Sequence, residues 1–542
     1  MRDVIVVGAG GGGPVVAKEL AARGLDVLLL EAGPAWQDPE REWSHDENVA
    51  NNPATGIFRF GPGDRTQAPW PRDLPQNSFL WQTAGVGGST LHYFGNSPRA
   101  MPDAFAGYRE LIPYYEWVEH TLPVQTAAMG TKEELFLRGA TSAGLPTQTS
   151  KDISGAACRP QQNAILQPQG TAGRTDRATQ LVYPRAKGCT FCGHCPQGCF
   201  LPLKAPLNLK AKRSTHVSYV PMALTADRWT HGRAATLVPD AFAVKVGAEG
   251  ALRSVTWRNT RSGALTTEEA KVVVLAGGPV ETPRLWLNSG LPNANDQVGR
   301  GLTDHYLDFV VGRFTHYTGS SKGATSAARA DFPGHGCIEQ VGAAPGLQAQ
   351  GLTDSLEPGR RVLGARLKRF LANLDRLIAI AVITDDDVQP ANRVTLSQAM
   401  TPDANGPIAR LELRSRTART LANRDFLAAQ AVKILKALGA REIVRMNWAP
   451  VLLHLHSTMR MGAVISPDWE SLAVERVFVA DNSALPNALG GPNPTLTTQA
   501  FATRTAERIF VRYFGGDPWV GRESPVSSVD DSVTRAVLAA GL

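Results

Sequence analysis

The sequence opens with a glycine spacing that is suited to binding phosphate. Residues 4–34 read VIVVGAGGGGPVVAKELAARGLDVLLLEAGP, in which Gly8, Gly10 and Gly13 have the G-x-G-x-x-G spacing. The first glycine of such a motif permits a tight turn, the second lets a pyrophosphate approach the backbone, and the third lets a helix pack on the strand. The N–H groups that begin the helix attract phosphate, and Glu31, after the next apolar run, can accept hydrogen bonds from a ribose diol. The pattern predicts a dinucleotide site, for NAD or for FAD.

Four of the six cysteines form a second cluster with spacing suited to chemistry. Residues 188–199 read GCTFCGHCPQGC, which places Cys189, Cys192, Cys195 and Cys199 in a C-x2-C-x2-C-x3-C run. Such a run is similar to the ligand spacing of bacterial ferredoxins, although Phe200 stands where ferredoxins have proline. The same four thiols could instead hold zinc or be structural. The sequence leaves these three interpretations open.

Two histidines near the carboxyl terminus are candidates for a general base. The segment HLHSTMRMG, residues 454–462, contains His454 and His456. Imidazole suits proton transfer because its ordinary pKa lies near working pH. If the segment is extended, both side chains point to the same side, so the spacing alone does not choose between them.

The elements that would position these residues are of two kinds. Apolar runs at 4–7, 27–30, 241–246 and 272–275 read as strands, and 15–20 and 282–288 as helices, which predicts a Rossmann-type sheet completed late in the chain. Residues 310–450 differ, with short strands at 377–383, 393–396 and 409–413. A long amphipathic helix follows at 417–438, with an apolar stripe of Leu421, Ala428, Val432 and Leu435. The fold class is therefore α/β, joined to a separate antiparallel sheet with a helix on it (α+β).

Composition limits the partners and the location. The chain has 542 residues and a net charge of +7, but it has no block of consecutive Lys or Arg, so we expect no nucleic-acid partner. The densest basic stretch, 204–213, reads as a solvated face. No apolar run is long enough to span a membrane, and the first strand begins too early for a signal peptide to precede it, so a cytoplasmic location is expected.

Together these motifs resemble those of the glucose–methanol–choline (GMC) oxidoreductase family of flavoenzymes. The resemblance covers nearly the whole chain, with departures at Trp286, Pro292 and Ser457. It rests on the glycine motif with Glu31, GVGGST at 85–90, GGPVETPRL at 277–285, VGRGLTDH at 298–305, HLHSTMRMG at 454–462 and DNSALPNALGGPNPTLT at 481–497. It implies FAD bound by a discontinuous domain of residues 1–100, 180–310 and 451–515. It also implies a substrate domain of residues 101–179 and 311–450 with a six-stranded antiparallel sheet, followed by a tail at 516–542.

The family also implies roles for individual residues. The catalytic histidine of the motif corresponds to His454, which would take the proton of an alcohol while a hydride passes to flavin N5. Asn493 would hold the substrate oxygen, as an amide can both accept from an alcohol and donate to a developing alkoxide. Some relatives carry a covalent flavin bond on a histidine with the spacing of His92. The implied FAD contacts are Gly8, Gly10, Gly13, Glu31, Gly87, Gly88, Ser89, His92, Asn96, Val244, Asp481, Asn482, Pro494 and Thr495, and no metal site is assigned.

The resemblance predicts an FAD-dependent alcohol dehydrogenase or oxidase but leaves its substrate open. Asn493 favours sugars, glycosides or polyols, whereas the cysteine block favours sterols or long-chain alcohols. Oxygen, a quinone or a protein could be the electron acceptor. Two alternatives are an electron-transfer subunit with an iron–sulfur centre at the cysteines and a non-redox lyase in which FAD is structural.

Overall fold

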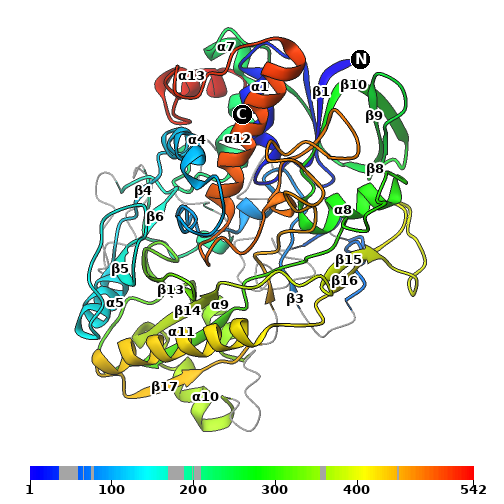
Figure 1. Cartoon of the computed structure of the whole chain (residues 1–542). Coiled ribbons are helices and arrows are strands. Elements are labelled where there is room, and N and C mark those ends of the chain that lie inside the picture. Colours follow the sequence, from blue (N-terminus) through cyan, green and yellow to red (C-terminus); the bar gives the residue numbers. More distant parts are fainter. Residues whose placement is uncertain are drawn as a thin grey trace.

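Two sheets occupy opposite halves of the molecule, and the segments that join them enclose a cavity. The computed structural model describes residues 1–35, 59–64, 66–74, 79–168, 188–197, 199, 209–353, 362–448 and 451–542. The parallel-rich sheet lies in the upper half of Figure 1, and the antiparallel sheet lies in the lower half with α11 across it. The α/β class with a separate antiparallel sheet is thus confirmed.

The upper sheet has the strand order of a Rossmann-type domain. In the described part it contains seven strands, of which β7, β2, β1, β10, β9 and β8 follow in order while β19 also pairs with β10. The pairings of β1, β2, β7, β10 and β19 are parallel, and β9 is antiparallel to both β10 and β8. The strands are β1 (Arg2–Val7), β2 (Val27–Leu30), β7 (Thr236–Val238), β8 (Ala241–Gly247), β9 (Arg253–Asn259), β10 (Leu265–Leu275) and β19 (Val477–Val479).

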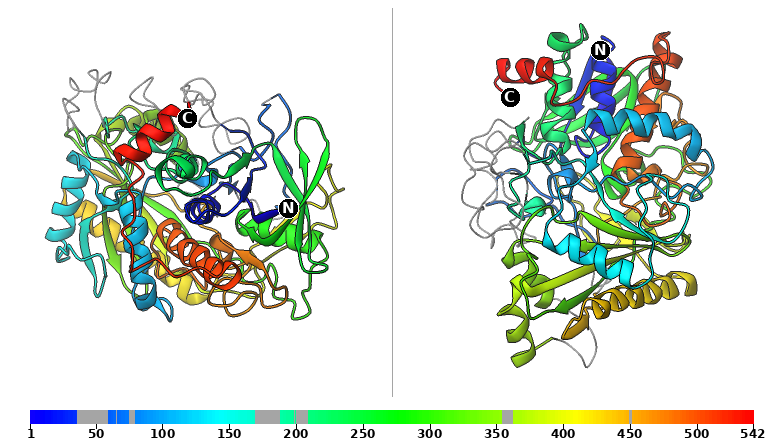
Figure 2. Two further views of the ribbon diagram at one scale, coloured as in Figure 1. Left: turned by 90° about the horizontal axis from the view of Figure 1, so that it is seen from above. Right: turned by 90° about the vertical axis from the view of Figure 1, so that its left-hand side faces the viewer.

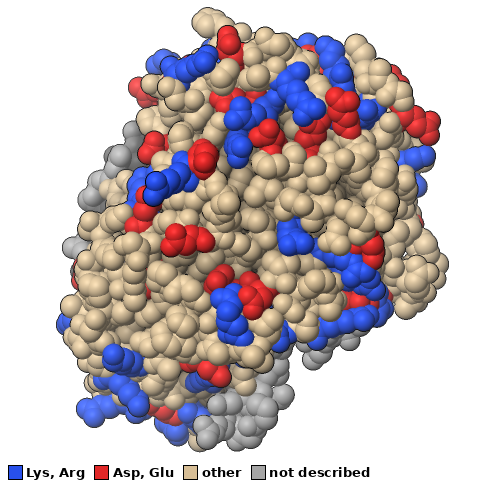
Figure 3. Space-filling view, viewed as in Figure 1, with Lys and Arg blue, Asp and Glu red and all other residues tan. Residues whose placement is uncertain are grey.

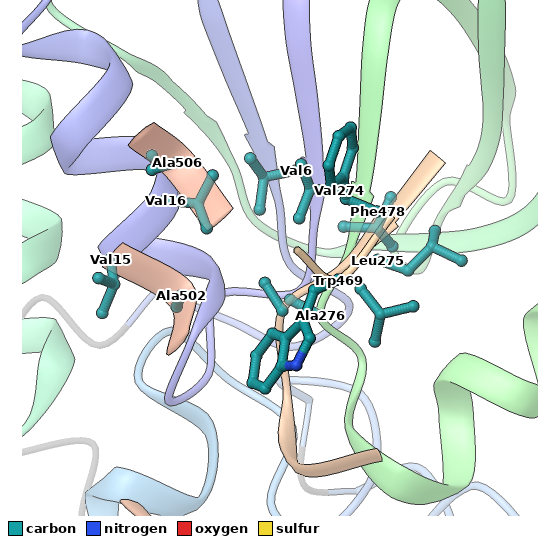
Figure 4. Packing of buried hydrophobic residues seen from close by; sticks show 14 of the residues in the cluster. Val6, Val15, Val16, Val274, Leu275, Ala276, Trp469, Phe478, Ala502 and Ala506 are labelled. Carbon is teal, nitrogen blue, oxygen red and sulfur yellow. The ribbon is translucent and has the colours of Figure 1, made fainter. Parts of the chain in front are cut away.

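Helices from both ends of the chain cover this sheet. Helix α1 (Gly13–Ala21) packs between α12 (Thr495–Phe514) and α6 (Tyr219–Leu224), and α12 also contacts α4 (Tyr108–Thr121). Figure 4 shows Val15 and Val16 of α1 near Ala502 and Ala506 of α12, with Val6 and Val274 on the neighbouring strands. The amino- and carboxyl-terminal segments therefore share one apolar core.

The lower sheet is antiparallel throughout and has one face covered by helices. Its order is β17 (Glu442–Arg445), β11 (Asp308–Arg313), β14 (Leu377–Thr384), β13 (Gly336–Val341), β12 (Ala328–Phe332) and β5 (Ala157–Pro160). Helices α11 (Ala418–Ala437) and α5 (Thr131–Ser142) pack on one face of it. The right-hand view of Figure 2 shows α11 along the outer side of this sheet.

The apolar stripe expected on α11 was wrong at Leu421. The Leu421 side chain is 47% exposed, and Val432 is only partly buried. The buried face consists instead of Leu427, Ala428, Ala431, Ile434 and Leu435. Helix α11 begins after Thr417, whose side chain accepts a hydrogen bond from the N–H of Thr420. The buried face of its first turns passes through Thr420 and Arg424, so Leu421 lies beside that face and is exposed.

The remaining elements pack on one half or the other. They include α7 (Ala226–Trp229), α8 (Gly278–Asn288), α9 (Pro345–Thr353), α10 (Gly364–Leu371) and α13 (Asp531–Ala539). Of these, α7 and α13 are in contact with each other, α8 packs against β8, and α9 packs against α10. Helix α8 begins at Gly278, four residues before the expected start. Pro279 does not prevent this, because the first turn of a helix tolerates proline. Three two-stranded sheets are β3 (Phe79–Leu80) with β18 (Val451–Leu452), β4 (Gln125–Thr126) with β6 (Gln162–Asn163), and β15 (Arg393–Leu396) with β16 (Ala409–Glu412).

On the face of the molecule seen in Figure 3, charged side chains of both signs are dispersed rather than gathered in one patch. The expected solvated face at 204–213 was wrong for the residues that the structure describes, since Lys210, Lys212 and Arg213 are buried. Within the described ranges, no helix combines the length and the apolar composition that crossing a bilayer requires.

Candidate functional site

The glycine turn forms one wall of a cavity of about 780 Å³. Gly8 has φ +107°, and a Cβ there would lie 2.3 Å from the carbonyl oxygen of Ala276. A Cβ on Gly13 would lie 2.0 Å from the oxygen of Gly8, which explains why α1 can pack so closely on β1. Gly10 differs, because a Cβ there would meet only the Gly88 Cα at 4.0 Å. Gly8 and Gly13 thus serve the fold, whereas the space at Gly10 belongs to the cavity.

Glu31 fastens three backbone segments around this turn. Its Oε2 accepts from the N–H of Ala9 at 2.9 Å, and its Oε1 accepts from the N–H groups of Gly33 at 2.9 Å and Gly85 at 3.0 Å. Burial raises the pKa of the carboxyl, and these backbone hydrogen bonds oppose the rise. Glu31 lines the cavity, as expected of a residue that would contact a bound dinucleotide. By accepting from both Ala9 and Gly85, it also joins the first glycine motif to the glycine block at 85–88.

The second glycine block brings His92 to the cavity wall. Gly87 and Gly88 have φ +108° and +48° and lead into a 3-10 turn, η1 (Gly88–Leu91). His92 follows, buried, with its Nδ1 2.9 Å from the Thr83 hydroxyl. Burial lowers the pKa of His92 to about 3, with a smaller contribution from Lys212.

The carboxyl-terminal segment supplies the opposite wall. Asp481 accepts from the N–H of Gly278 at 2.9 Å and from the Thr282 hydroxyl at 2.6 Å, so it holds the start of α8. Burial raises the pKa of this carboxyl. Asn493 is 8% exposed, and its Oδ1 is buried with no hydrogen-bond partner among the described residues.

Most of the expected cofactor residues line this single cavity. They are Gly8, Gly10, Glu31, Gly88, Ser89, His92, Asn96, Asp481, Asn482, Asn493, Pro494 and Thr495. Gly13, Gly87 and Val244 are not in the lining of the described cavity. Ala243 lines it beside Val244, whose carbonyl accepts instead from Asn288 of α8.

Of the two candidate bases, His454 lines the cavity and His456 does not. His456 is fully buried, its Nδ1 lies 3.1 Å from the Ser457 hydroxyl, and its backbone pairs with Thr303. His454 instead meets His305, with the two Nδ1 atoms 3.0 Å apart. The geometry therefore separates two histidines that their spacing alone did not distinguish.

The partners of His305 assign the tautomer of His454. His305 Nε2 lies 3.1 Å from the carbonyl oxygen of Ala488, which can only accept, so Nε2 carries a proton. Burial lowers the pKa of His305 to about 4, so the ring is neutral near pH 7 and its Nδ1 is an acceptor. The proton between the two Nδ1 atoms therefore belongs to His454. This leaves the lone pair of His454 on Nε2, the nitrogen that a base would use.

Asp304 holds the same histidine through its backbone. The N–H of His454 donates to Asp304 Oδ1 at 3.0 Å. Burial raises the pKa of Asp304 to about 8, although Arg416, 3.9 Å away, opposes the rise. Burial and His305 together lower the pKa of His454 well below its ordinary value, so His454 is neutral near pH 7.

Sequence reasoning missed the roles of Asp304 and His305. Both lie in VGRGLTDH, residues 298–305, which served only as a family motif. A signal was available: an adjacent acid and histidine directly before the strand β11, at the end of a glycine-containing turn. The sequence alone does not show that residue 305 lies next to residue 454 in the folded chain.

The cysteine segment lies beside the cavity and is fastened by Lys212. Lys212 Nζ donates to the carbonyl oxygens of Leu91 at 2.8 Å, Tyr93 at 3.0 Å and Cys195 at 2.6 Å. Cys189 is buried in an apolar cluster against which Cys195 and Cys199 also pack. Among the residues that the structure describes, no group of three or more His, Cys, Asp or Glu side chains is placed to hold a metal ion.

Comparisons with known proteins agree with this architecture. Family models for GMC oxidoreductases match residues 171–307 and 388–502. The 6'''-hydroxyparomomycin C oxidase of Streptomyces lividus is 25% identical over 94% of this chain and 91% of its own length. The 2-methyl-1,2-propanediol dehydrogenase of Mycolicibacterium austroafricanum is 26% identical over 94% of this chain and 95% of its own. The crystal structure of pyridoxine 4-oxidase from Mesorbium loti covers 95% of this chain and 100% of that chain, with a TM-score of 0.63 at 14% identity.

These matches cover both halves of the fold. The amino-terminal match ends just beyond the Asp304–His305 pair, and the carboxyl-terminal match includes His454 and Asn493. The full-length relatives and the structural neighbour extend the likeness over the rest of the chain. The chain therefore belongs to the GMC oxidoreductase family.

Proposed function

We propose that the protein binds FAD and oxidises an alcohol to the corresponding carbonyl compound, with His454 as the base and Asn493 as its partner. The observation that carries this proposal is the pairing of His454 with His305, which leaves a neutral imidazole with its lone pair on Nε2 at the cavity. The names of the two relatives, an oxidase and a propanediol dehydrogenase, are consistent with alcohol oxidation.

The cavity lining fits FAD, the cofactor that the family implies. Gly10, Gly11 and Gly12 lie at the start of α1, where free N–H groups and the helix dipole favour a pyrophosphate. Pro494 and Thr495 place the start of α12 at the same cavity. The buried, unpartnered Oδ1 of Asn493 is a polar atom that a bound molecule would satisfy. When bound, FAD supplies the hydride acceptor at N5 of its ring.

The residues of this chain would handle the proton. His454 Nε2 takes the hydroxyl proton of the substrate as the hydride leaves its carbon, so the alcohol loses one proton and one hydride and becomes a carbonyl compound. His305 accepts from Nδ1–H of His454 and keeps the ring oriented while Nε2 acquires charge. Asn493 donates from its amide to the developing alkoxide.

The test is anaerobic reduction of the flavin by a panel of alcohols. We expect bleaching of the flavin absorbance by at least one sugar, polyol, sterol or long-chain alcohol. Absence of bleaching by every alcohol, with FAD fully bound, would favour the lyase alternative. Acid precipitation shows whether the yellow colour stays with the protein, which decides whether His92 carries the flavin covalently.

The electron-transfer alternative depends on the four clustered cysteines. Elemental analysis for iron, together with absorbance beyond the flavin bands, tests for an iron–sulfur centre. Turnover that requires an added partner protein and forms little peroxide would favour that alternative, whereas peroxide formation in air would identify oxygen as the acceptor. The cytoplasmic location and the domain boundaries remain predictions from the sequence.

A further inference from the structure

The antiparallel sheet has two apolar faces. Helices α11 and α5 cover one face, whereas residues of α9 and α10 cover part of the other and the cavity lies against the rest. On β14, Ile378, Ile380 and Val382 face α11 and belong to the buried core beneath that helix. The alternate residues of the same strand, Leu377, Ala379, Ala381 and Ile383, line the cavity. Neighbouring β11 repeats the pattern, because its Val310 joins the core while Phe309 and Val311 line the cavity.

The other walls of this part of the cavity are apolar as well. Leu453 lies next to His454, and Met446 and Trp448 follow the last strand of the sheet. The Phe309 and Trp448 rings pack with their centroids 4.5 Å apart. Helix α9 contributes Leu347 and Leu352.

The polar side chains of this region are mostly bonded to the protein already. The Ser320 hydroxyl donates to the carbonyl oxygen of Leu374, and Gln348 donates to that of Ala343. Glu339 accepts from Asn96 at 2.7 Å and from Gln161 at 3.2 Å. Four groups of the lining, the Thr325 hydroxyl, the Trp448 indole N–H, Gln82 Oε1 and Asn96 Oδ1, are buried with no hydrogen-bond partner among the described residues. Set among the apolar side chains of this wall, they would leave most hydroxyls of a polyol without a partner.

From this wall we infer the class of the substrate. We propose that the alcohol carries its hydroxyl at one end of an extended apolar skeleton, either a long chain or a fused ring system, which lies along the residues of β14 and β11 that line the cavity. This deepens the proposed function, on which it rests.

The physical reason is a balance of two energies. Each methylene removed from water gains up to about 0.8 kcal/mol, so an apolar skeleton binds more tightly as more of it contacts the wall. Each hydroxyl of a sugar that finds no partner there would lose roughly 1–3 kcal/mol.

The first experiment measures anaerobic flavin reduction by primary alcohols from butanol to dodecanol, by a sterol, and by glucose and glycerol. We expect the apparent second-order rate constant to rise with chain length until the wall is filled. The rise should be up to about fourfold per methylene, which is the factor that corresponds to the burial energy of one methylene. The sterol arm distinguishes a fused-ring substrate from a linear one. Glucose or glycerol reducing the flavin as efficiently as the best apolar alcohol would overturn the proposal while leaving alcohol oxidation intact.

A second experiment uses binding without turnover. Methyl decyl ether has no hydroxyl proton for His454 to take, and we expect the melting temperature of the holoenzyme to rise with the logarithm of its concentration above the dissociation constant. If it does so although no alcohol reduces the flavin, the proposed function fails and the apolar binding site stands. If it has no effect, the proposal for the apolar wall fails.

A variant pair locates the binding site on the sheet. Ala379→Phe adds a ring to the cavity wall, and we expect it to lower the ratio of decanol to butanol reactivity by about tenfold, as two methylenes lose their contacts. Ala372→Phe is the matched control, because Ala372 is exposed at the end of α10, outside the cavity lining. An unchanged ratio in Ala379→Phe, with the ether shift also unchanged, would contradict the assignment.

Discussion

At the scale of single residues, proton transfer depends on which nitrogen of His454 has the lone pair. A neutral imidazole can present either nitrogen as the base, and solvent would allow both tautomers. Here the carbonyl of Ala488 determines the proton on His305, and His305 in turn determines the proton on His454. The carbonyl oxygen of Ala488, which contacts His305 but not His454, thus determines that Nε2 is the basic nitrogen of His454.

The first prediction concerns His454 itself. We expect His454→Ala to bind FAD normally but to reduce its flavin on the order of a hundredfold more slowly or worse, because a general base is lost. Stopped-flow absorbance under anaerobic conditions measures the rate, and the ratio of flavin to protein absorbance measures FAD content. His316→Gln, at an exposed histidine, is the control. Unchanged reduction kinetics in His454→Ala would rule out His454 as the base.

The second prediction concerns His305 as a positioning residue. His305→Leu removes the acceptor for Nδ1–H of His454, and we expect flavin reduction to slow by about 10- to 100-fold. Because His305 contributes to the lowered pKa of His454, the acid limb of the pH–rate profile should move to higher pH in this variant. His305→Asn keeps an acceptor near the Nδ1 position and should recover part of the rate. A slower reaction with an unmoved acid limb and no recovery by Asn would indicate a structural role only.

At the scale of elements, a buried lysine joins segments that are distant in sequence. Lys212 donates to the carbonyl oxygens of Leu91 and Tyr93, which flank His92. It also donates to that of Cys195, in the cysteine segment. Burial lowers its pKa to about 8, so its ammonium is charged near pH 7 and all three donors are available for the three carbonyl oxygens. Hydrogen bonds from this one side chain therefore hold the cysteine segment against the part of the cavity wall that contains His92.

The third prediction follows from this contact. Lys212→Met leaves the carbonyl oxygens of Leu91, Tyr93 and Cys195 without their donor, and we expect the free energy of unfolding to fall by about 2–5 kcal/mol. Urea denaturation followed by tryptophan fluorescence measures the change. The control, Lys433→Met, removes an exposed lysine of α11 and should change stability by less than about 0.5 kcal/mol. Equal stabilities for the two variants would contradict the role of Lys212.

At the scale of the whole molecule, buried histidines make stability depend on pH. Burial lowers the pKa of His92 and His216 to about 3 and that of His305 to about 4, from an ordinary value of 6.5. Below pH 6.5 the unfolded chain takes up protons that the native chain does not, so stability is lost as the pH falls from 6.5 toward these values.

The fourth prediction isolates one of these groups. His216→Gln should reduce the loss of unfolding free energy between pH 6.5 and 4, by up to about 1.4 kcal/mol for each pH unit, because one proton-binding site disappears from the unfolded chain. Denaturation curves at several pH values measure the slope. His120→Gln, at an exposed histidine, should leave the slope unchanged. An identical slope in both variants would contradict the linkage.

The sequence predicted the features that local pattern and chain order determine. The glycine turn, strand β1, strand β15 and helix α11 follow from apolar period and turn chemistry, whereas the domain boundaries stay a prediction. It could not predict what distant contacts determine. Lys212 reads as a surface residue because its partner carbonyl at Leu91 lies 121 residues away, and the pairing of His305 with His454 spans 149 residues.

Strand β10 has a consequence for the order in which the protein matures during synthesis. It borders β1 on one side and β9 on the other, and β19, formed by residues 477–479, joins it only near the end of the chain. Asp481 and Asn482 leave the ribosome just after β19, so the wall opposite the glycine turn cannot exist on a nascent chain until these residues have been made. A nascent chain must therefore carry its glycine turn without the opposite wall while the several hundred residues between them are made.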